Sequence, residues 1–384
     1  MQQSTSPTIH HFSSTLPTEL IDHILSEGEF PKQDLARICL ISKQFLDSAR
    51  HSLYRQLEAV WAKPNRTDKN ETGEGWFQRF YQTDRTKLLL SALRAVSHCS
   101  HLVVSFSFSN SYQDIKADGD IWQSCEQVIH EVLSLLPNIQ HIKLSSAFMD
   151  AAHHLTSAVV NPESVLSIDV PHLYVYPIQS LANLRNLSKL RFLNVGSHPL
   201  DSNEASDGGF SILPNLRTLD CIQETSVAPQ RFSHQLTVLR IPHDCGGVDF
   251  SQLSALRHLM LTGAWDEPIN LPDMSALVEL TTLYLEDWMP SHPRSSFNSV
   301  VGQVVTIAPP QKIRLVFPRA VPYSSLVDHL KRNAPFPAHE IRLSPQSLSD
   351  HRHVVSVNEL AIACNRKGIK LSYDSEARID VFRL

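Results

Sequence analysis

Side chains that could carry out chemistry are scattered through the chain, and their spacing limits what they can do. His98, Cys99 and His101 are ligand types that zinc prefers, but no partner set stands around them at zinc spacing. His243-Asp244-Cys245 has the composition of a catalytic triad, whose members seldom adjoin in sequence because their side chains must converge in space. We interpret the first group as a helix-to-strand junction with a buried thiol and the second as a loop.

Other catalytic signatures are missing from the sequence as well. It contains neither a phosphate-binding loop, nor a dinucleotide-binding glycine pattern, nor a serine nucleophile elbow. His153-His154 and His351-Arg352-His353 are expected to be solvated. We therefore predict that the protein is not an enzyme and uses no cofactor and no metal. An enzyme of another type is the alternative, and it would need a deep pocket with converging polar groups.

Length and composition are those of an ordinary globular protein. The 384 residues allow two or three domains, and 42% of them are apolar. The net charge of −5 comes without a basic block, which argues against a nucleic-acid partner. The sequence has no apolar run of the ~20 residues that span a bilayer and no signal-peptide pattern, so we expect no membrane partner and a cytoplasmic or nuclear location. The six cysteines, none in a CxxC pair, are expected to be buried thiols.

An apolar pattern recurs between residues 139 and 285, with apolar residues at its first, fourth and sixth positions. Its starts are 26, 25, 26, 20, 20 and 24 residues apart, and strand-like runs at Ile313, Ile341 and Ile369 follow in steps of 28. Such spacing is typical of leucine-rich repeats, in which stacked strand–helix units share one core. A doubly wound α/β enzyme domain is the alternative. The matches are Ile139-Ile142-Leu144, Val165-Ile168-Val170, Leu190-Leu193-Val195, Leu216-Leu219-Cys221, Leu236-Leu239-Ile241, Leu256-Leu259-Leu261 and Leu280-Leu283-Leu285.

Strand alternation predicts which residues face away from this core, on the concave side of the stacked repeats. The expected set mixes polar, aromatic and arginine side chains, which suits a protein-binding surface. Arg240, Met260 and Tyr284 fall on successive strands and should be near neighbours. The full set is His141, Lys143, Asp169, Phe192, Asn194, Thr218, Asp220, Arg240, His258, Met260, Thr282, Tyr284, Arg314 and Arg342.

Two tryptophans, Trp265 and Trp288, should lie in loops at the carboxyl edge of adjacent strands, each beside acidic residues. They could form a binding hot spot or cap the end of the core, and the exposed area of both indoles would discriminate. The residues predicted to bind a substrate protein are Arg240, His258, Met260, Trp265, Tyr284 and Trp288.

The N-terminal stretch 14–57 contains three short helical patterns with more apolar side chains than so small a unit can bury alone. The third helix is expected to continue to Trp61. Residues 1–13 are polar and expected to be disordered, and residues 62–75 are a Pro- and Gly-containing linker. The predicted units are therefore 1–13, 14–61, the linker 62–75, and a repeat domain at 76–384.

An ordered string of residues within this stretch resembles an F-box. It runs Leu16-Pro17-x-Glu19-Leu20-Ile21-x-x-Ile24-Leu25, then Asp34-Leu35, Cys39-Leu40-Ile41-Ser42-Lys43-x-Phe45 and Leu53-Tyr54. Phe45 stands where the family usually has tryptophan. With the repeats, the chain resembles F-box proteins with a degenerate leucine-rich-repeat domain. The implied α/β fold is a three-helix F-box followed by an irregular solenoid with a parallel sheet on its concave face.

The resemblance implies a substrate receptor of an SCF-type cullin–RING ubiquitin ligase. The F-box would bind a Skp-type adaptor, and the solenoid would bind an unknown target protein. A non-ligase scaffold, whose F-box-like helices only cap the solenoid, is the alternative. A docking unit should leave an apolar patch exposed, whereas a cap should bury it against the solenoid. The residues implied to contact the adaptor are Leu16, Pro17, Ile21, Ile24, Leu35, Leu40, Ile41 and Phe45.

Overall fold

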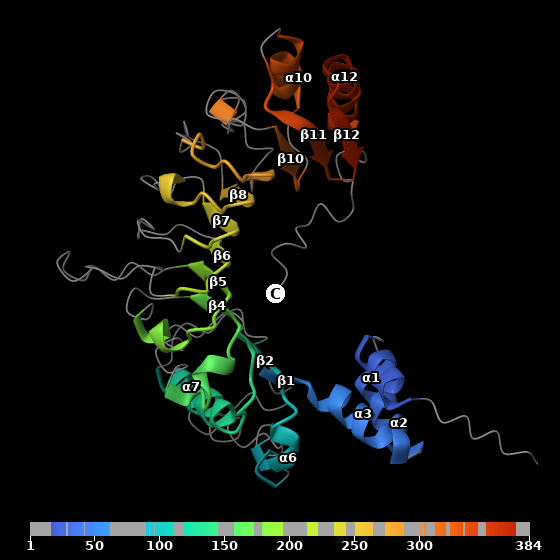
Figure 1. Cartoon of the computed structure of the whole chain (residues 1–384), viewed down its shortest axis with the longest axis vertical. Coiled ribbons are helices and arrows are strands. Elements are labelled where there is room, and N and C mark those ends of the chain that lie inside the picture. Colours follow the sequence, from blue (N-terminus) through green and yellow to red (C-terminus); the bar gives the residue numbers. More distant parts are fainter. Residues whose placement is uncertain are drawn as a thin grey trace, which may run out of the picture.

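The chain folds into three N-terminal helices and an open, curved parallel sheet of twelve strands (Figure 1). It is an α/β protein whose sheet does not close into a barrel. The computed structural model describes residues 17–27, 30–41, 43–61, 90–91, 93–95, 97–110, 119–144, 157–172, 179–194, 213–221, 234–242, 250–263, 273–287, 300, 303–304, 312–319, 323–332, 335–344 and 351–373.

The helical unit consists of α1 (Thr18–Glu27), α2 (Lys32–Ile41) and α3 (Lys43–Tyr54). Pro17 and Pro31 precede the first two helices, and their carbonyl oxygens accept the first helical hydrogen bonds. Proline suits a helix start because its missing N–H would have no partner there. The three helices share a small core of Ile21, Leu25, Leu35 and Ala49, with Ile38, Cys39, Phe45 and Leu53 packed around it.

The sheet is parallel throughout, and each strand pairs only with its neighbours in sequence. Such an order lets the sheet extend as a row of consecutive units. Its strands are β1 (Gln56–Trp61), β2 (Ser105–Asn110), β3 (His141–Leu144), β4 (Ser167–His172), β5 (Lys189–Asn194), β6 (Thr218–Cys221), β7 (Val238–Pro242), β8 (His258–Gly263), β9 (Thr282–Asp287), β10 (Ile313–Phe317), β11 (Ala338–Leu343) and β12 (Lys370–Tyr373).

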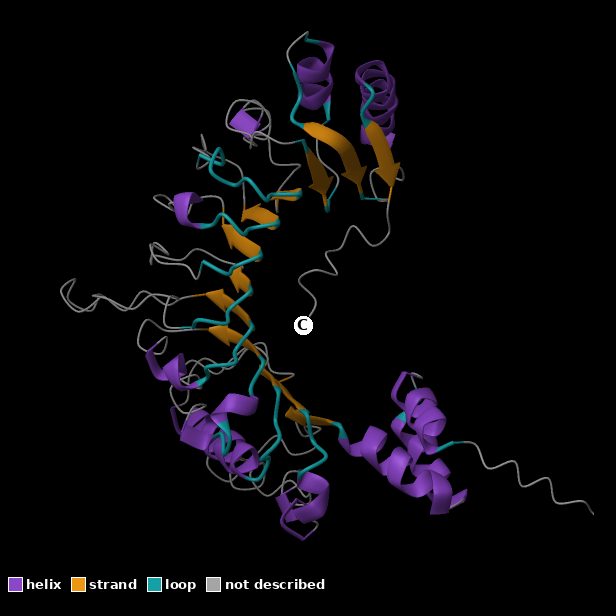
Figure 2. Ribbon diagram, viewed as in Figure 1, coloured by secondary structure: helices purple, strands orange, loops and turns teal. Residues whose placement is uncertain are grey.

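Helices between the strands lie on the outer side of the curved sheet (Figure 2). Parallel strands need such crossovers, because the chain must return to the start of the next strand. These helices lie away from the inner, concave face (Figure 2). They are α6 (Ser97–Ser100), α7 (Gly119–Ser134), η1 (Pro162–Ser164), η2 (Gln179–Asn183), η4 (Phe250–Gln252), α10 (Ser324–Lys331) and α12 (His351–Lys367).

The main core lies between the sheet and these crossovers, and one in-register row of aliphatic side chains runs through it. Burial of each such side chain stabilises the fold by roughly 1.5–3 kcal/mol. Burial of this outer-side row is therefore a major source of the stability of the sheet. The row is Ile142, Ile168, Leu190, Leu219, Leu239, Leu259, Leu283, Leu315 and Ile341, all buried.

Asparagines at the entry to three strands tie consecutive repeats together. Each stands directly before the first apolar residue of the repeat pattern and donates its side-chain N–H to a backbone carbonyl of the preceding unit. The bonds run from Asn138 to His101 (2.9 Å), from Asn186 to Glu163 (2.8 Å) and from Asn215 to Arg185 (2.9 Å).

Two sequence predictions need correction, and the first concerns residues 56–61. They form strand β1, so the prediction that the third helix continues to Trp61 is wrong. α3 ends at Tyr54, and Arg55 alone separates it from β1, which pairs in parallel with β2. The sheet thus begins before the predicted linker at 62–75. That linker and the segment 1–13 lie outside the described residues.

The second correction concerns the phase of the repeat pattern in β5. Leu190 pairs with Ile168, which makes it the fourth position of the pattern, with Leu187 as the first and Phe192 as the sixth. The pattern assigned from Leu190 to Val195 is therefore displaced by three residues. Lys189 and Arg191, rather than Phe192 and Asn194, occupy the rows of the inner face.

Candidate functional site

One row of residues crosses the whole inner face. The parallel pairing aligns one position from each strand, and over the middle strands these positions alternate between cations and carboxylates. The alternation depends on the register, since a shift of one residue would turn every side chain to the other face. From β1 to β12 the row reads Glu58, Ser107, Lys143, Asp169, Arg191, Asp220, Arg240, Met260, Tyr284, Val316, Arg342 and Ser372.

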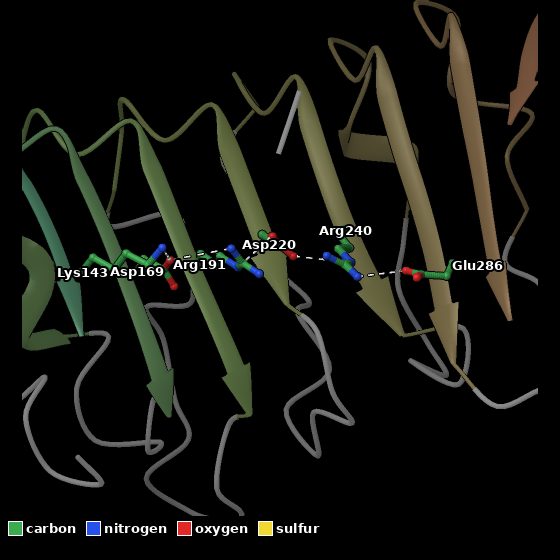
Figure 3. A network of polar contacts seen from close by, with 6 residues as sticks. All are labelled: Lys143, Asp169, Arg191, Asp220, Arg240 and Glu286. Atoms are coloured by element: carbon green, nitrogen blue, oxygen red, sulfur yellow. Dashed lines mark hydrogen bonds and ion pairs between the residues drawn. The ribbon is translucent and has the colours of Figure 1, made fainter. Parts of the chain in front are cut away.

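The five charged members of this row on β3 to β7 form a chain of ion pairs (Figure 3). Each cation lies between two carboxylates or at an end of the chain. Glu286, two residues beyond Tyr284 on β9, continues it, and Arg319 Nε donates to Glu286 Oε1 at 2.8 Å. The contacts drawn are Lys143 Nζ to Asp169 Oδ2 (3.9 Å), Arg191 Nη1 to Asp169 Oδ2 (3.7 Å), Arg191 Nε to Asp220 Oδ2 (3.3 Å), Arg240 Nε to Asp220 Oδ1 (3.6 Å) and Arg240 Nη2 to Glu286 Oε2 (3.0 Å).

Asp220 is the most deeply buried carboxylate of this chain. Arg191 and Arg240 flank it, but neither carboxylate oxygen has a hydrogen bond of good geometry within the described structure. Burial raises the pKa of the Asp220 carboxyl to about 6, and the positive charges of Arg240 and Arg191 offset only part of that effect. Desolvation penalises a charge unless hydrogen bonds replace the lost water. The ionised form of Asp220 is therefore poorly stabilised by its surroundings.

Apolar residues replace the charges on β8 to β10. Met260, Tyr284 and Val316 continue the row, and together with Val238 they form a small buried cluster separate from the main core. Arg240, Met260 and Tyr284 are neighbours on successive strands, as the sequence predicted. Met260 and Tyr284 are buried, and their predicted contact with a substrate protein stays a prediction.

The other predicted substrate-binding residues divide in two groups. His258 lies on β8 beside Val238 and Thr282, and its Nδ1 atom has no hydrogen-bond partner in the described structure. Burial lowers the pKa of His258, and the charges of Arg314 and Arg257 lower it further, which favours the neutral ring. Trp265 and Trp288 lie outside the described residues.

A second cluster of charges surrounds Glu340 on β11. Arg314 Nε donates to Glu340 Oε2 at 2.7 Å, and the Ser372 hydroxyl donates to Oε1 at 2.8 Å. Arg342 and Lys370 lie 3.6 and 3.5 Å from Oε1. The sequence predicted Arg314 and Arg342 for the inner face but missed Glu340. The signal that would have found it is its position two residues before Arg342 in the same strand.

The helical unit has exposed apolar side chains. Leu40 is 87% exposed, and Leu20 and Ile24 are also exposed, as are the polar and proline positions around them. Ile21 and Leu35, which the resemblance implied as adaptor contacts, are instead buried in the unit's own core.

The remaining adaptor residues are placed less completely. Phe45 is half-buried against the core of the helical unit, and Pro17 is exposed. Leu16 and the side chain of Ile41 lie outside what the structure describes. Leu20 belongs to the F-box-like string but was not among the predicted adaptor contacts. It is exposed, as are Ile24 and Leu40.

The residues first considered for chemistry do not form a site in the described part of the chain. Cys99 is buried, and His101 is exposed and bonded through its carbonyl to Asn138. His153-His154 and His243-Asp244-Cys245 are not among the described residues. Within the described ranges, His, Cys, Asp and Glu side chains nowhere gather in a set of three that could hold a metal ion. The described helices also include none that is long and apolar enough to cross a membrane.

Comparisons with known proteins leave the functional argument to these features. No protein-family model matches the chain, and no curated protein matches it at a significant level. Two features of the described structure bear on function. They are the inner face of the sheet with its ion pairs, and the exposed apolar side chains of the helical unit.

Proposed function

We propose that this protein is the substrate-recognition subunit of an SCF-type cullin–RING ubiquitin ligase. In this proposal α1 to α3 are an F-box that binds a Skp-type adaptor, and the sheet with its crossovers is an irregular leucine-rich-repeat-like solenoid that binds a target protein. The ordered F-box-like string and the repeat spacing supply the sequence support. Such a receptor works in the cytoplasm or the nucleus.

The exposed apolar side chains of the helical unit carry the proposal. Leu20, Ile24 and Leu40 are exposed although α1 to α3 already share a core of their own. A cap would turn such residues toward the sheet, whereas a docking unit keeps them available for a partner. A standard interface buries about 800 Å² per partner, and exposed leucine and isoleucine side chains are suitable contacts for it.

The proposed role requires no catalytic group in this chain. A receptor raises the local concentration of its target near a ubiquitin-charged enzyme, and the chemistry takes place on that enzyme. The two surfaces have to be held at a defined separation for this purpose. The direct connection of α3 to β1 through Arg55 provides a short, stiff link between them.

The test is co-purification of the full chain with a Skp-type adaptor, followed by an affinity measurement. We expect Leu20→Gln combined with Leu40→Gln to weaken adaptor binding by roughly tenfold or more, because both changes remove exposed apolar contacts. The control is Val278→Gln combined with Ile362→Gln, which alters two exposed apolar residues elsewhere, 57% and 55% exposed against 43% for Leu20 and 87% for Leu40. Failure of the wild-type chain to bind, or equal binding by both double variants, would contradict the proposal.

A scaffold whose helices only cap the sheet is the second candidate. The single residue between α3 and β1 favours it, because the helical unit thereby adjoins the first strand of the sheet. If this candidate is correct, deletion of residues 1–54 should expose the edge of the sheet and lower the midpoint of urea unfolding. A docking unit should leave that midpoint nearly unchanged.

A further inference from the structure

The ion pairs of the inner face join more cations than carboxylates, although the whole chain has a net charge of −5. These ion pairs join seven cations to four carboxylates, which leaves an excess of three positive charges. The cations are Lys143, Arg191, Arg240, Arg314, Arg319, Arg342 and Lys370, and the carboxylates are Asp169, Asp220, Glu286 and Glu340.

Solvent exposure increases this imbalance. The four carboxylate side chains are only 3–15% exposed, while Lys370, Lys143 and Arg319 are 71%, 64% and 49% exposed. The physical reason is length, because arginine and lysine side chains reach past the shorter carboxylates and keep their charged ends near water. A partner that approaches the inner face therefore meets cations first.

We propose that the inner face binds an acidic peptide segment of a target protein, which deepens and rests on the proposed function. Complementary charge steers such a segment to the face and fixes its register across the strands. The buried carboxylates restrict the conformations of the arginine side chains before a ligand binds, so less side-chain entropy is lost on binding.

A protein segment fits these observations better than a nucleic acid. Each of these seven cations already shares a buried carboxylate, and the excess of three charges is spread over β3 to β12. Nucleic acids bind to clustered, unpaired lysine and arginine side chains, and an overall negative chain repels them at long range.

The test measures binding of fluorescein-labelled octaglutamate to the full chain by fluorescence polarisation. Octalysine and octaglutamine peptides serve as probes of charge sign. We expect octaglutamate alone to bind, with an affinity that falls as salt rises from about 50 to about 200 mM. We expect Arg319→Gln combined with Lys370→Gln to weaken binding by roughly fivefold or more, as two exposed charge contacts predict.

The double variant should fold normally, because each buried carboxylate keeps one arginine partner. Glu286 keeps Arg240 at 3.0 Å, and Glu340 keeps Arg314 at 2.7 Å. Lys331→Gln is the control, since Lys331 is similarly exposed but pairs with Glu359 on the outer helices α10 and α12. It should change binding by less than about twofold.

Three outcomes would overturn the inference. Octaglutamate fails to bind, or the double variant binds as tightly as wild type, or a single-stranded oligodeoxynucleotide of eight residues binds more tightly than octaglutamate and loses affinity in the same variant. Adaptor binding is measured separately, through the helical unit. A chain that binds the adaptor but not octaglutamate contradicts only this inference, and the reverse result contradicts only the proposed function.

Discussion

Asp220 and Glu340 are two buried carboxylates on one face of one sheet, yet their surroundings affect them in opposite ways. Burial raises the pKa of Asp220 to about 6, despite the neighbouring charges of Arg240 and Arg191. Burial also acts to raise the pKa of Glu340, but hydrogen bonds from Arg314 and Ser372 and the charges of Arg314 and Lys370 outweigh it. The pKa of Glu340 is lowered to about 2.

The two carboxyls differ in three respects. Glu340 accepts side-chain hydrogen bonds and Asp220 does not, Glu340 has three cations nearby against two for Asp220, and the charges of Asp169 and Glu286 raise the pKa of Asp220. Both groups have arginines within 3.6 Å. Only Glu340 accepts well-aligned hydrogen bonds, at 2.7 and 2.8 Å. Charged hydrogen bonds of this length replace the water that burial removes. We therefore expect Glu340 to stabilise the fold and Asp220 to contribute little when it is ionised.

Replacement of Glu340 should have the largest effect. Glu340→Gln removes the acceptor charge beneath Arg314, Arg342 and Lys370, so we expect the free energy of unfolding to fall by about 2–3 kcal/mol at neutral pH. Urea denaturation followed by circular dichroism measures this change. The exposed Glu359→Gln provides a control. A loss below about 1 kcal/mol would mean that the Glu340 cluster is no more stabilising than an exposed pair.

Acid titration should distinguish the two carboxylates next. Because its pKa is lowered, Glu340 contributes stability that is fully present above about pH 4.5 and is lost as the pH falls toward about 2. The stability difference between wild type and Glu340→Gln should therefore shrink as the pH falls from about 6 to about 3. Parallel urea denaturation curves at several pH values test this. A difference that stays constant would contradict the lowered pKa.

Replacement of Asp220 should have a smaller effect with the opposite pH dependence. The raised pKa gives stability that is present below about 3.8 and is lost as the pH rises through about 6. Asparagine does not titrate, so the free energy of unfolding of Asp220→Asn should rise relative to that of wild type as the pH rises through about 6. At pH 7 the two free energies should differ by less than about 1 kcal/mol. A loss comparable to that of Glu340→Gln would show that Asp220 is satisfied after all.

The exposed pair Lys331–Glu359 should give the smallest effect. Lys331 Nζ lies 3.3 Å from Glu359 Oε2, and both side chains are more than half exposed. Exposed pairs contribute less than about 1 kcal/mol, so Lys331→Gln should lower the unfolding free energy by no more than about 0.5 kcal/mol. High salt should remove even this small effect, because salt screens exposed pairs more than buried ones. A larger loss would point to a packing role for the Lys331 stem between α10 and α12.

Much of the sheet could be predicted from the sequence because its core pattern is local. Apolar residues at the first, fourth and sixth positions of each repeat indicated the strands and their buried face. The same reasoning failed for β5, where Leu187, Leu190 and Leu193 allow two phases of one pattern. Pairing with β4 selects the phase, and a single repeat carries no information about that pairing.

Residues 56–61 show a different limit. Leu53 and Leu57 continue a helical spacing of four residues, so the pattern indicated a longer third helix. The strand forms because β2 offers it a parallel partner, and tertiary pairing overrides a weak local preference. The same limit applies to the helical unit, where apolar spacing did not separate buried Ile21 and Leu35 from exposed Leu40.

The sequence predicted most residues of the candidate site but not which of them form ion pairs with one another. The sequence placed Lys143, Asp169, Asp220 and Arg240 on the inner face. Their alternation of sign across strands depends on crossover lengths that set which residue stands beside which. Arg191 was missed through the phase error in β5, and it is the cation that joins Asp169 to Asp220.

The strictly sequential strand order has a consequence for how this protein can evolve. Loss of one repeat, such as the 20 residues from Leu236 to Ala255, would bring β8 beside β6 and leave Leu219 next to Leu259. The aliphatic row would remain continuous, while Asp220 would face Met260 instead of Arg240. Duplication or deletion of single repeats can therefore rewrite the charge sequence of the inner face without disturbing the core. New binding preferences are accessible to such a chain in one genetic step.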